Sequence, residues 1–154
     1  PEHVKALGLL STAAGRTKED KNKVLAVVKS MEHHGIPKIL PTLIDRWFTD
    51  DFIKTSSDII KRRIQQVIKT DPKIFMNVFY IYANTEMSPW LHKIKCPTLV
   101  IAGENDSGCN PRLNKFIANE MKKSKLVILP GLKHSILLEA SNEVSKYLIN
   151  FFLK

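Results

Sequence analysis

Two short apolar runs, separated by a helical pattern, constrain the fold of this 154-residue chain more than any other feature. Residues 97–102 and 125–130 are rich in aliphatic and β-branched side chains, which is typical of buried strands. Apolar side chains recur at helical spacing in residues 111–121 and again in residues 144–152. Because parallel strands need a crossover between them, this alternating order predicts an α/β protein with a parallel sheet.

An acid and a histidine follow the two predicted strands. Asp106 lies four residues past the first run, in Gly-Glu-Asn-Asp, and His134 lies four residues past the second, in Gly-Leu-Lys-His. Neighbouring strands lie about 4.8 Å apart, and the loops that leave the carboxyl ends of parallel strands open at the same edge of the sheet. We therefore predict that the Asp106 carboxylate orients the imidazole of His134, whose other nitrogen can then act as a base. A purely structural pair is the alternative.

One further strand and a long helical region precede this unit. Residues 3–10 form a short apolar run that we predict to be a third buried strand. Residues 16–88 show helical patterns and no strand pattern. We therefore expect residues 1–15 and 89–154 to form a partial α/β core, and residues 16–88 to form a helical insertion.

Capping signals predict where the helices of this insertion begin. Thr17 and Asp20 have the spacing of a capping box. Ser57 can cap a later helix, and Asp71 precedes a proline at a first helical position. The two prolines within residues 36–48 predict a short, broken helix there.

The charge of the chain does not by itself select a partner. Lys and Arg number 24 against 15 Asp and Glu, which gives a net charge of +9. The basic residues are spread along the chain, and the densest run, residues 61–63, falls within a helical pattern. We interpret the charge as a solvated, lysine-rich exterior and predict neither a nucleic-acid nor a membrane partner. No apolar run reaches membrane-spanning length.

The two cysteines predict neither a disulfide framework nor a metal site. Cys96 precedes a strand, and Cys109 follows the Asp106 loop, where it is either near the site or a bystander. No pair of histidines lies one helical turn apart with a third ligand nearby, so we predict no metal and no cofactor. This cysteine usage fits a reducing compartment, and we expect a cytoplasmic protein.

Three stretches of the last third of the chain have an order and spacing known from one protein family. They are Cys96–Asp106, Val127–Ser135 and the start of a helix at Glu139–Val144. Together they resemble the C-terminal portion of the α/β-hydrolase superfamily. Residues 1–12 resemble the sixth strand of that family, and residues 16–88 resemble the helical cap that its members insert after this strand. Arg46–Phe52 more weakly resembles the cap of 3-oxoadipate enol-lactonase-like members.

The resemblance implies a hydrolase whose nucleophile is not in this chain. Asp106 and His134 match the acid and the base of the family's triad, but no G-x-S-x-G stands in the 154 residues. Ser11 follows a strand but lacks the flanking glycines, so we interpret it as structural or as part of a pocket edge. A serine nucleophile would imply ester, lactone or thioester hydrolysis, and an aspartate would imply dehalogenase or epoxide-hydrolase chemistry. A cysteine stays open as well.

The resemblance also implies that this chain does not work alone. The first five strands, the nucleophile and the oxyanion hole of the family lie outside the matched portion, and we expect the chain by itself to be inactive. The strand near residue 7 would be an apolar edge without the usual protection. Since the chain begins at Pro1 rather than Met, we expect a fragment or processed product that needs the N-terminal half of the fold. A partner chain, a longer precursor or a swapped dimer could supply it.

Aromatic residues of the predicted cap are candidates for a substrate pocket. In the family that the chain resembles, the cap covers the active site, and this implies a small apolar ester or lactone as substrate. The candidate lining residues are Trp47, Phe48, Phe75, Phe79 and Trp90, with Met87 beside them. Plain core packing is the alternative for each aromatic. A non-catalytic interaction or receptor module with the same fold is the alternative for the whole chain.

Overall fold

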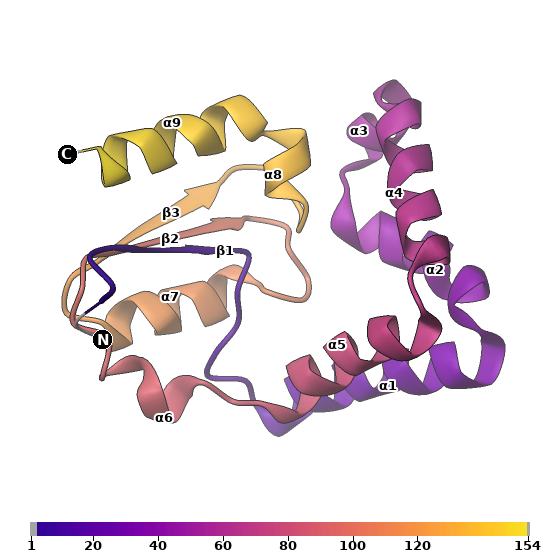
Figure 1. The fold of residues 1–154 in the computed structure, drawn as a ribbon, viewed down its shortest axis with the longest axis horizontal. Helices are drawn as coiled ribbons and strands as arrows, with labels where there is room; N and C mark the ends of the chain where they lie inside the picture. Colours follow the sequence, from indigo (N-terminus) through magenta and orange to yellow (C-terminus); the bar gives the residue numbers. More distant parts are fainter. Residues whose placement is uncertain (1–2, 154) are drawn as a thin grey trace. The chain divides into compact units, whose positions relative to one another are not determined.

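A computed structural model describes residues 3–153, and these form two compact units (Figure 1). Unit 1 contains the chain up to Gly15 and again from Met87 onward, and unit 2 is Arg16–Glu86. The chain therefore leaves unit 1 once and returns to it once. Within the described residues, no helix combines the length and the apolar character that crossing a membrane would require.

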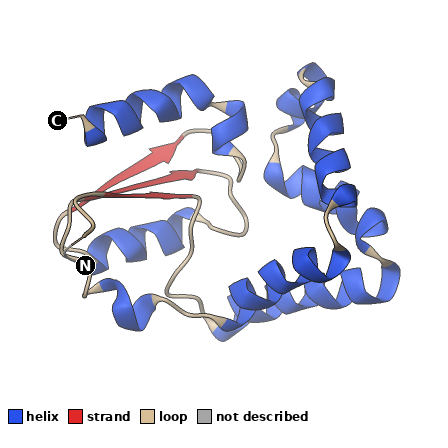
Figure 2. Cartoon of the chain, in the orientation of Figure 1, coloured by secondary structure: helices blue, strands red, loops and turns tan. Residues whose placement is uncertain are grey.

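Unit 1 is built on a three-stranded parallel sheet (Figure 2). Its strands are β1 (Leu7–Leu10), β2 (Thr98–Gly103) and β3 (Ser124–Leu129), in the order β1-β2-β3. The central strand β2 is buried along its whole length, as its continuous apolar sequence predicts. The three strands confirm the sequence prediction, although β1 is shorter than the run of residues 3–10.

Side chains of β2 alternate between two cores, one on each face of the sheet. Val100 packs with the inner face of α7 (Pro111–Glu120), and Leu99 and Ile101 pack on the other side with α9 (Ser141–Phe152). Figure 1 shows these two helices on opposite faces of the sheet. Two short helices, α6 (Ser88–Leu91) and α8 (Ile136–Glu139), complete the unit. Because successive side chains of β2 point to opposite faces of the sheet, helices cover both faces, and the carboxyl end of β2 lies between these two helical layers.

Unit 2 contains helices and no strands among its described residues. The helices are α1 (Lys18–His34), α2 (Ile36–Trp47), α3 (Asp50–Thr55), α4 (Ser57–Lys69) and α5 (Pro72–Asn84). Their inward faces share one apolar core, whose buried members are Met31, Ile36, Leu40, Leu43, Ile44, Phe48, Ile60 and Val67. Unit 2 thus lies within the range in which the sequence predicts a helical insertion, residues 16–88, and it has a hydrophobic core of its own.

Two of the predicted helix starts are confirmed. Thr17 and Asp20 form a capping box, in which each side chain accepts a hydrogen bond from the other residue's backbone N–H. Asp71 caps α5 by accepting from the backbone N–H of Lys73 at 2.7 Å. Both caps satisfy N–H groups that the first helical turn leaves without partners.

The predictions for Ser57 and for residues 36–48 were wrong in detail. Helix α4 begins one residue earlier than a Ser57 cap allows, since Ser56 is its N-cap residue and makes no side-chain capping bond. Residues Ile36–Trp47 form one helix rather than a broken one, with Pro41 in its interior. Burial of the apolar face of α2 outweighs the hydrogen bond that this proline removes.

A buried arginine fastens the two ends of unit 2 to each other. The backbone N–H of Arg16 donates to the Glu86 carboxylate at 3.1 Å. Its guanidinium donates to the carbonyl oxygens of Tyr82 and Thr85 and lies 4.6 Å from the centre of the Tyr82 ring. Because its side chain is only 5% exposed, these partners replace the water that a guanidinium normally binds. The first and last residues of the insertion are thereby held together.

Candidate active site

The structure brings Asp106 and His134 together at the carboxyl edge of the sheet in unit 1. The Nδ1 atom of His134 lies 2.7 Å from the Oδ2 atom of Asp106. The Asp106 side chain is 1% exposed and the His134 side chain is 38% exposed, so the acid is internal and the imidazole reaches the surface of this chain. This orientation leaves Nε2 as the ring nitrogen available to a reacting group.

The Asp106 carboxylate is fixed from both of its oxygens. While Oδ2 faces the imidazole, Oδ1 accepts the backbone N–H groups of Gly108 at 2.9 Å and Cys109 at 2.8 Å. Asn114 of α7, which is fully buried, donates its amide to the carbonyl of Cys109 at 2.7 Å and thereby shapes the same loop. The acid is therefore an acceptor held in one orientation, as an orienting carboxylate must be.

Gly103, at the end of β2, allows the two site loops to touch. A Cβ atom at this position would lie 2.1 Å from the carbonyl oxygen of Lys133 and 2.4 Å from that of Leu132. Only a residue without a side chain fits against the backbone that leads into His134. The first residue of Gly-Glu-Asn-Asp is therefore required by the close approach of the loops.

The two residues after Gly103 bind the histidine loop directly. Glu104 accepts the backbone N–H of Gly131 at 2.9 Å, and Gly131 adopts a left-handed φ of +70° that favours glycine. The backbone N–H of Asn105 donates to the carbonyl of Leu132 at 2.8 Å, and its side-chain amide donates to the carbonyl of Gly131 at 3.1 Å. These hydrogen bonds join the loop after β2 to the loop after β3, and they thereby set the distance between the acid and the histidine.

Ser11, at the end of β1, holds the backbone of the histidine. Its hydroxyl donates to the carbonyl oxygen of His134 at 2.9 Å, and its own backbone N–H donates to Ile101 on the central strand. It has a positive φ of +47°, which is uncommon for a residue other than glycine. This places Ser11 as a support of the histidine loop, in agreement with the structural interpretation of its sequence context.

The neighbours of His134 favour its protonated form. Burial lowers its pKa, but the hydrogen bonds with the Asp106 carboxylate and the Cys109 side chain outweigh burial and raise the pKa to about 10. The surroundings of His134 therefore stabilise an imidazolium paired with the Asp106 carboxylate, which is the form that the ring would take after it accepts a proton. This is the charge state that an orienting acid stabilises in a triad.

Cys109 is the site residue that the sequence left undecided. Its Sγ atom, a carboxylate oxygen of Asp106 and a ring nitrogen of His134 all lie within 4.8 Å of one another. It is buried and not in a disulfide. The spacing alone could not reveal this, because the turn that brings residue 109 back to residue 106 is created by the hydrogen bonds to Asp106.

The predicted pocket aromatics do not form one group within either unit. Phe48 has no exposed surface and stacks on Phe52 with ring centres 5.6 Å apart, in the core of unit 2. Trp47, Phe75 and Phe79 are partly buried against that same core. Trp90 belongs to α6 of unit 1 and is 48% exposed.

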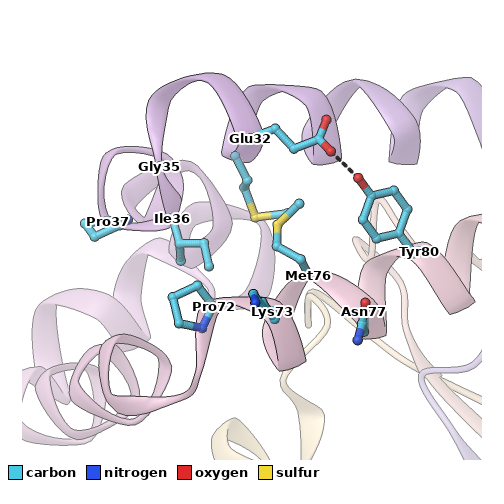
Figure 3. A pocket seen from close by; sticks show the side chains of 10 residues that line it. Glu32, Gly35, Ile36, Pro37, Pro72, Lys73, Met76, Asn77 and Tyr80 are labelled. Carbon is cyan, nitrogen blue, oxygen red and sulfur yellow. Dashed lines mark hydrogen bonds between the residues drawn. The ribbon is translucent and has the colours of Figure 1, made fainter.

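Unit 2 also contains a pocket that the sequence did not predict (Figure 3). Its volume is about 570 Å³, and its lining residues are Met31, Glu32, Gly35, Ile36, Pro37, Pro72, Lys73, Met76, Asn77 and Tyr80. Figure 3 shows Tyr80 donating to the Glu32 carboxylate at one end, and this bond raises the pKa of the Tyr80 phenol. The lining holds no histidine or cysteine, so the Asp106–His134 pair is the stronger catalytic candidate.

Known proteins with similar sequence are hydrolases. The chain is 26% identical over 99 residues to 3-oxoadipate enol-lactonase 2 of Acinetobacter baylyi, covering 64% of this chain and 37% of that protein. It is 39% identical over 56 residues to the proline iminopeptidase PfmaB of Pestalotiopsis fici, covering 36% of this chain and 20% of that protein. No protein-family model matches the sequence.

Solved structures confirm the fold. The enol-lactonase from Burkholderia xenovorans superposes with a TM-score of 0.90 over 99% of this chain, at 19% sequence identity. The match covers 58% of that enzyme's chain, so this chain spans little more than half of its length. The resemblance to the C-terminal portion of the α/β-hydrolase fold, with its parallel strands and helical insertion, is thereby confirmed.

Proposed function

We propose that this chain, which has the C-terminal part of the α/β-hydrolase fold, supplies the acid and the base of a hydrolytic triad. The observation that carries the proposal is the 2.7 Å contact between His134 Nδ1 and a buried, doubly anchored carboxylate of Asp106. Asp106 fixes the tautomer of His134, and Nε2 takes the proton of a nucleophile during attack. The chain order of acid before histidine is the order found in α/β-hydrolases.

The nucleophile comes from the N-terminal half of the fold. The 154 residues contain no G-x-S-x-G, and Ser11 donates its hydroxyl to the backbone of His134 rather than to its ring. A partner chain or a longer precursor supplies that half. The apolar strand β1 supports this idea, because in the described sheet it pairs with β2 on one side and has no strand on the other.

The substrate is a small ester or lactone with an apolar part. Support comes from the names of the similar proteins, which include enol-lactonases and esterases. In unit 2 the candidates for substrate contact are the partly buried aromatics Trp47, Phe75 and Phe79, and in unit 1 the candidate is the half-exposed Trp90. Phe48 supports the three aromatics of unit 2 from the core of that unit, since none of its surface is exposed.

The test is to purify the protein from its own cells through a tag on this chain, so that any polypeptide completing the fold is retained. A fluorophosphonate probe should label a serine in the completed enzyme, and short-chain esters should be hydrolysed. His134→Ala should abolish turnover, and Asp106→Asn should lower kcat by about 10⁴ because it favours the wrong tautomer. His92→Ala, at an exposed histidine of the same unit, is the matched control and should leave kcat unchanged.

Each other outcome has a definite meaning. Turnover that survives His134→Ala contradicts the proposal. Hydrolysis of epoxides or alkyl halides without labelling identifies an aspartate nucleophile and overturns the esterase assignment. Salt-sensitive binding to an acidic partner without any turnover identifies an interaction module instead. Native mass spectrometry addresses the partner separately, since a catalytically active monomer of this chain alone contradicts the need for a second half.

A further inference from the structure

Three side chains at the carboxyl edge of the sheet form a donor set suited to a transition metal. Asp106, Cys109 and His134 each offer one ligand atom, and the three atoms lie within 4.8 Å of one another. Carboxylate oxygen, thiolate sulfur and imidazole nitrogen are the three ligand types that Zn²⁺ binds in proteins. Magnesium and calcium prefer oxygen ligands alone, so the sulfur and the nitrogen select a softer cation.

The distances fit a tetrahedral ion after small side-chain shifts. Bonds of about 2.0–2.3 Å in a tetrahedron separate neighbouring ligand atoms by about 3.3–3.7 Å. The Asp106 and His134 atoms, now 2.7 Å apart, must open by roughly half an ångström, and the sulfur must approach by up to about one ångström. Movements of this size are within the range that rotation about side-chain bonds provides.

The surroundings already orient the three ligands. Oδ1 of Asp106 is held by two backbone N–H groups, which leaves Oδ2 directed at the imidazole. Ser11 holds the carbonyl of His134. Such outer hydrogen bonds are the usual means by which proteins fix metal ligands. Because the His134 side chain is 38% exposed, solvent reaches this ligand set and can supply a fourth ligand.

We propose that Asp106, Cys109 and His134 bind one thiophilic divalent cation of the zinc type, with a water molecule as the fourth ligand. Binding releases the thiol proton of Cys109 and the ring proton that His134 shares with Asp106, and both protons go to solvent. The cation uses the side chains of the proposed catalytic pair. In the completed hydrolase it is therefore an inhibitor, because a metal-bound imidazole cannot accept the proton of a nucleophile.

Cobalt(II) tests the site on this chain without any assay of turnover. The chain is titrated with Co²⁺ alone at pH 7.5, with a phosphine reductant that keeps the thiols reduced. We expect one equivalent to bind, with the intense visible bands of a tetrahedral ion and a thiolate-to-cobalt charge-transfer band in the near ultraviolet. Zn²⁺ should displace the cobalt and remove both signals. The net charge of +9 disfavours non-specific cation binding, which keeps the background low.

Two cysteine variants make the assignment specific. Cys109→Ser should lose the charge-transfer band and weaken Co²⁺ binding at least tenfold, and Cys109→Ala should do the same. Cys96→Ser is the matched control, since it removes the other thiol of the chain, and it should bind like the parent. Circular dichroism confirms that each variant is folded before it is titrated.

The results that overturn the proposal are equally specific. They are an absence of the charge-transfer band at saturating cobalt, an unchanged band in folded Cys109→Ser and Cys109→Ala, or a band lost in Cys96→Ser. None of these results depends on hydrolysis, so the metal site can fail while the proposed triad stands. Loss of turnover in the His134→Ala enzyme bears on the triad alone.

Discussion

At the scale of single residues, Gly103 determines how closely the acid loop and the histidine loop approach. We expect Gly103→Ala to lower the free energy of unfolding by about 3 kcal/mol, because the new Cβ overlaps the carbonyl oxygens of Leu132 and Lys133. Those carbonyls belong to backbone, which cannot move aside as a flexible side chain would. Urea unfolding of both proteins measures the difference.

Gly108→Ala is the control for this substitution. It lies on the same loop, but the nearest atom to its new Cβ would be an oxygen of Asp106 at 3.6 Å, which is an ordinary contact. We expect the two substitutions to differ clearly in their effect on stability. Equal effects would show that the loops do not touch at Gly103.

The sequence predicts the acid and the histidine of the site but not what surrounds them. Asp106 and His134 follow two predicted strands at equal distances, and parallel strands bring such loops to one edge. The positions of Cys109 and Ser11 depend on turns made by specific hydrogen bonds, and no periodicity encodes these. Residues that support a site through the backbone are therefore the part that a pattern alone misses.

At the scale of elements, Pro41 weakens α2 from within. A proline in the interior of a helix removes one backbone hydrogen bond and disfavours the preceding turn. We expect Pro41→Ala to raise the free energy of unfolding by about 1–2 kcal/mol, after allowing for the greater freedom of the unfolded chain. Thermal unfolding of both proteins, monitored by circular dichroism, measures this change in stability.

Pro37 is the matched position for this test. It lies in the first turn of the same helix, where a missing N–H costs nothing. Pro37→Ala should therefore leave stability unchanged or lower it by about 0.5 kcal/mol. An equal gain from both substitutions would contradict the explanation.

Arg16 is the second element-scale test, because it joins the two ends of unit 2. Arg16→Ala removes the guanidinium that donates to the carbonyls of Tyr82 and Thr85 and pairs with Glu86, and we expect the free energy of unfolding to fall by about 2–3 kcal/mol. Arg16→Lys should restore little, since an ammonium cannot reproduce the planar fork. Arg62→Ala, at an exposed position of α4, should change stability by less than about 0.5 kcal/mol in the same urea series. Full rescue by lysine would show that charge alone matters.

The elements themselves were predicted unequally. The three strands follow from short continuous apolar runs, and the longer helices follow from apolar side chains at helical spacing, because both patterns are required for burial. The short helices α3, α6 and α8 span one turn or slightly more, too few residues to show a helical period. The prediction of a broken helix over residues 36–48 was wrong because burial of the apolar face of α2 outweighs the cost of a proline in the helix interior.

At the scale of the whole molecule, the acid–histidine pair makes stability depend on pH. The folded pKa of His134 is raised to about 10, above the unfolded value of about 6.5. The pair therefore contributes its full stabilisation below about pH 6.5 and loses it as pH rises through about 10. The difference in unfolding free energy between the parent and Asp106→Asn should shrink across this window. Curves that stay parallel from pH 6 to 10 would contradict the ion pair.

Whether Asp106 holds the imidazole of His134 is the question on which the site, the triad and the whole-molecule pH dependence all depend. The most direct measurement is an NMR titration of the His134 ring in the full chain, with a chelator present to exclude metal ions. We predict a midpoint near pH 10 in the parent protein and a return toward 6.5 in Asp106→Asn. A His134 midpoint near 6.5 in both proteins would contradict the account.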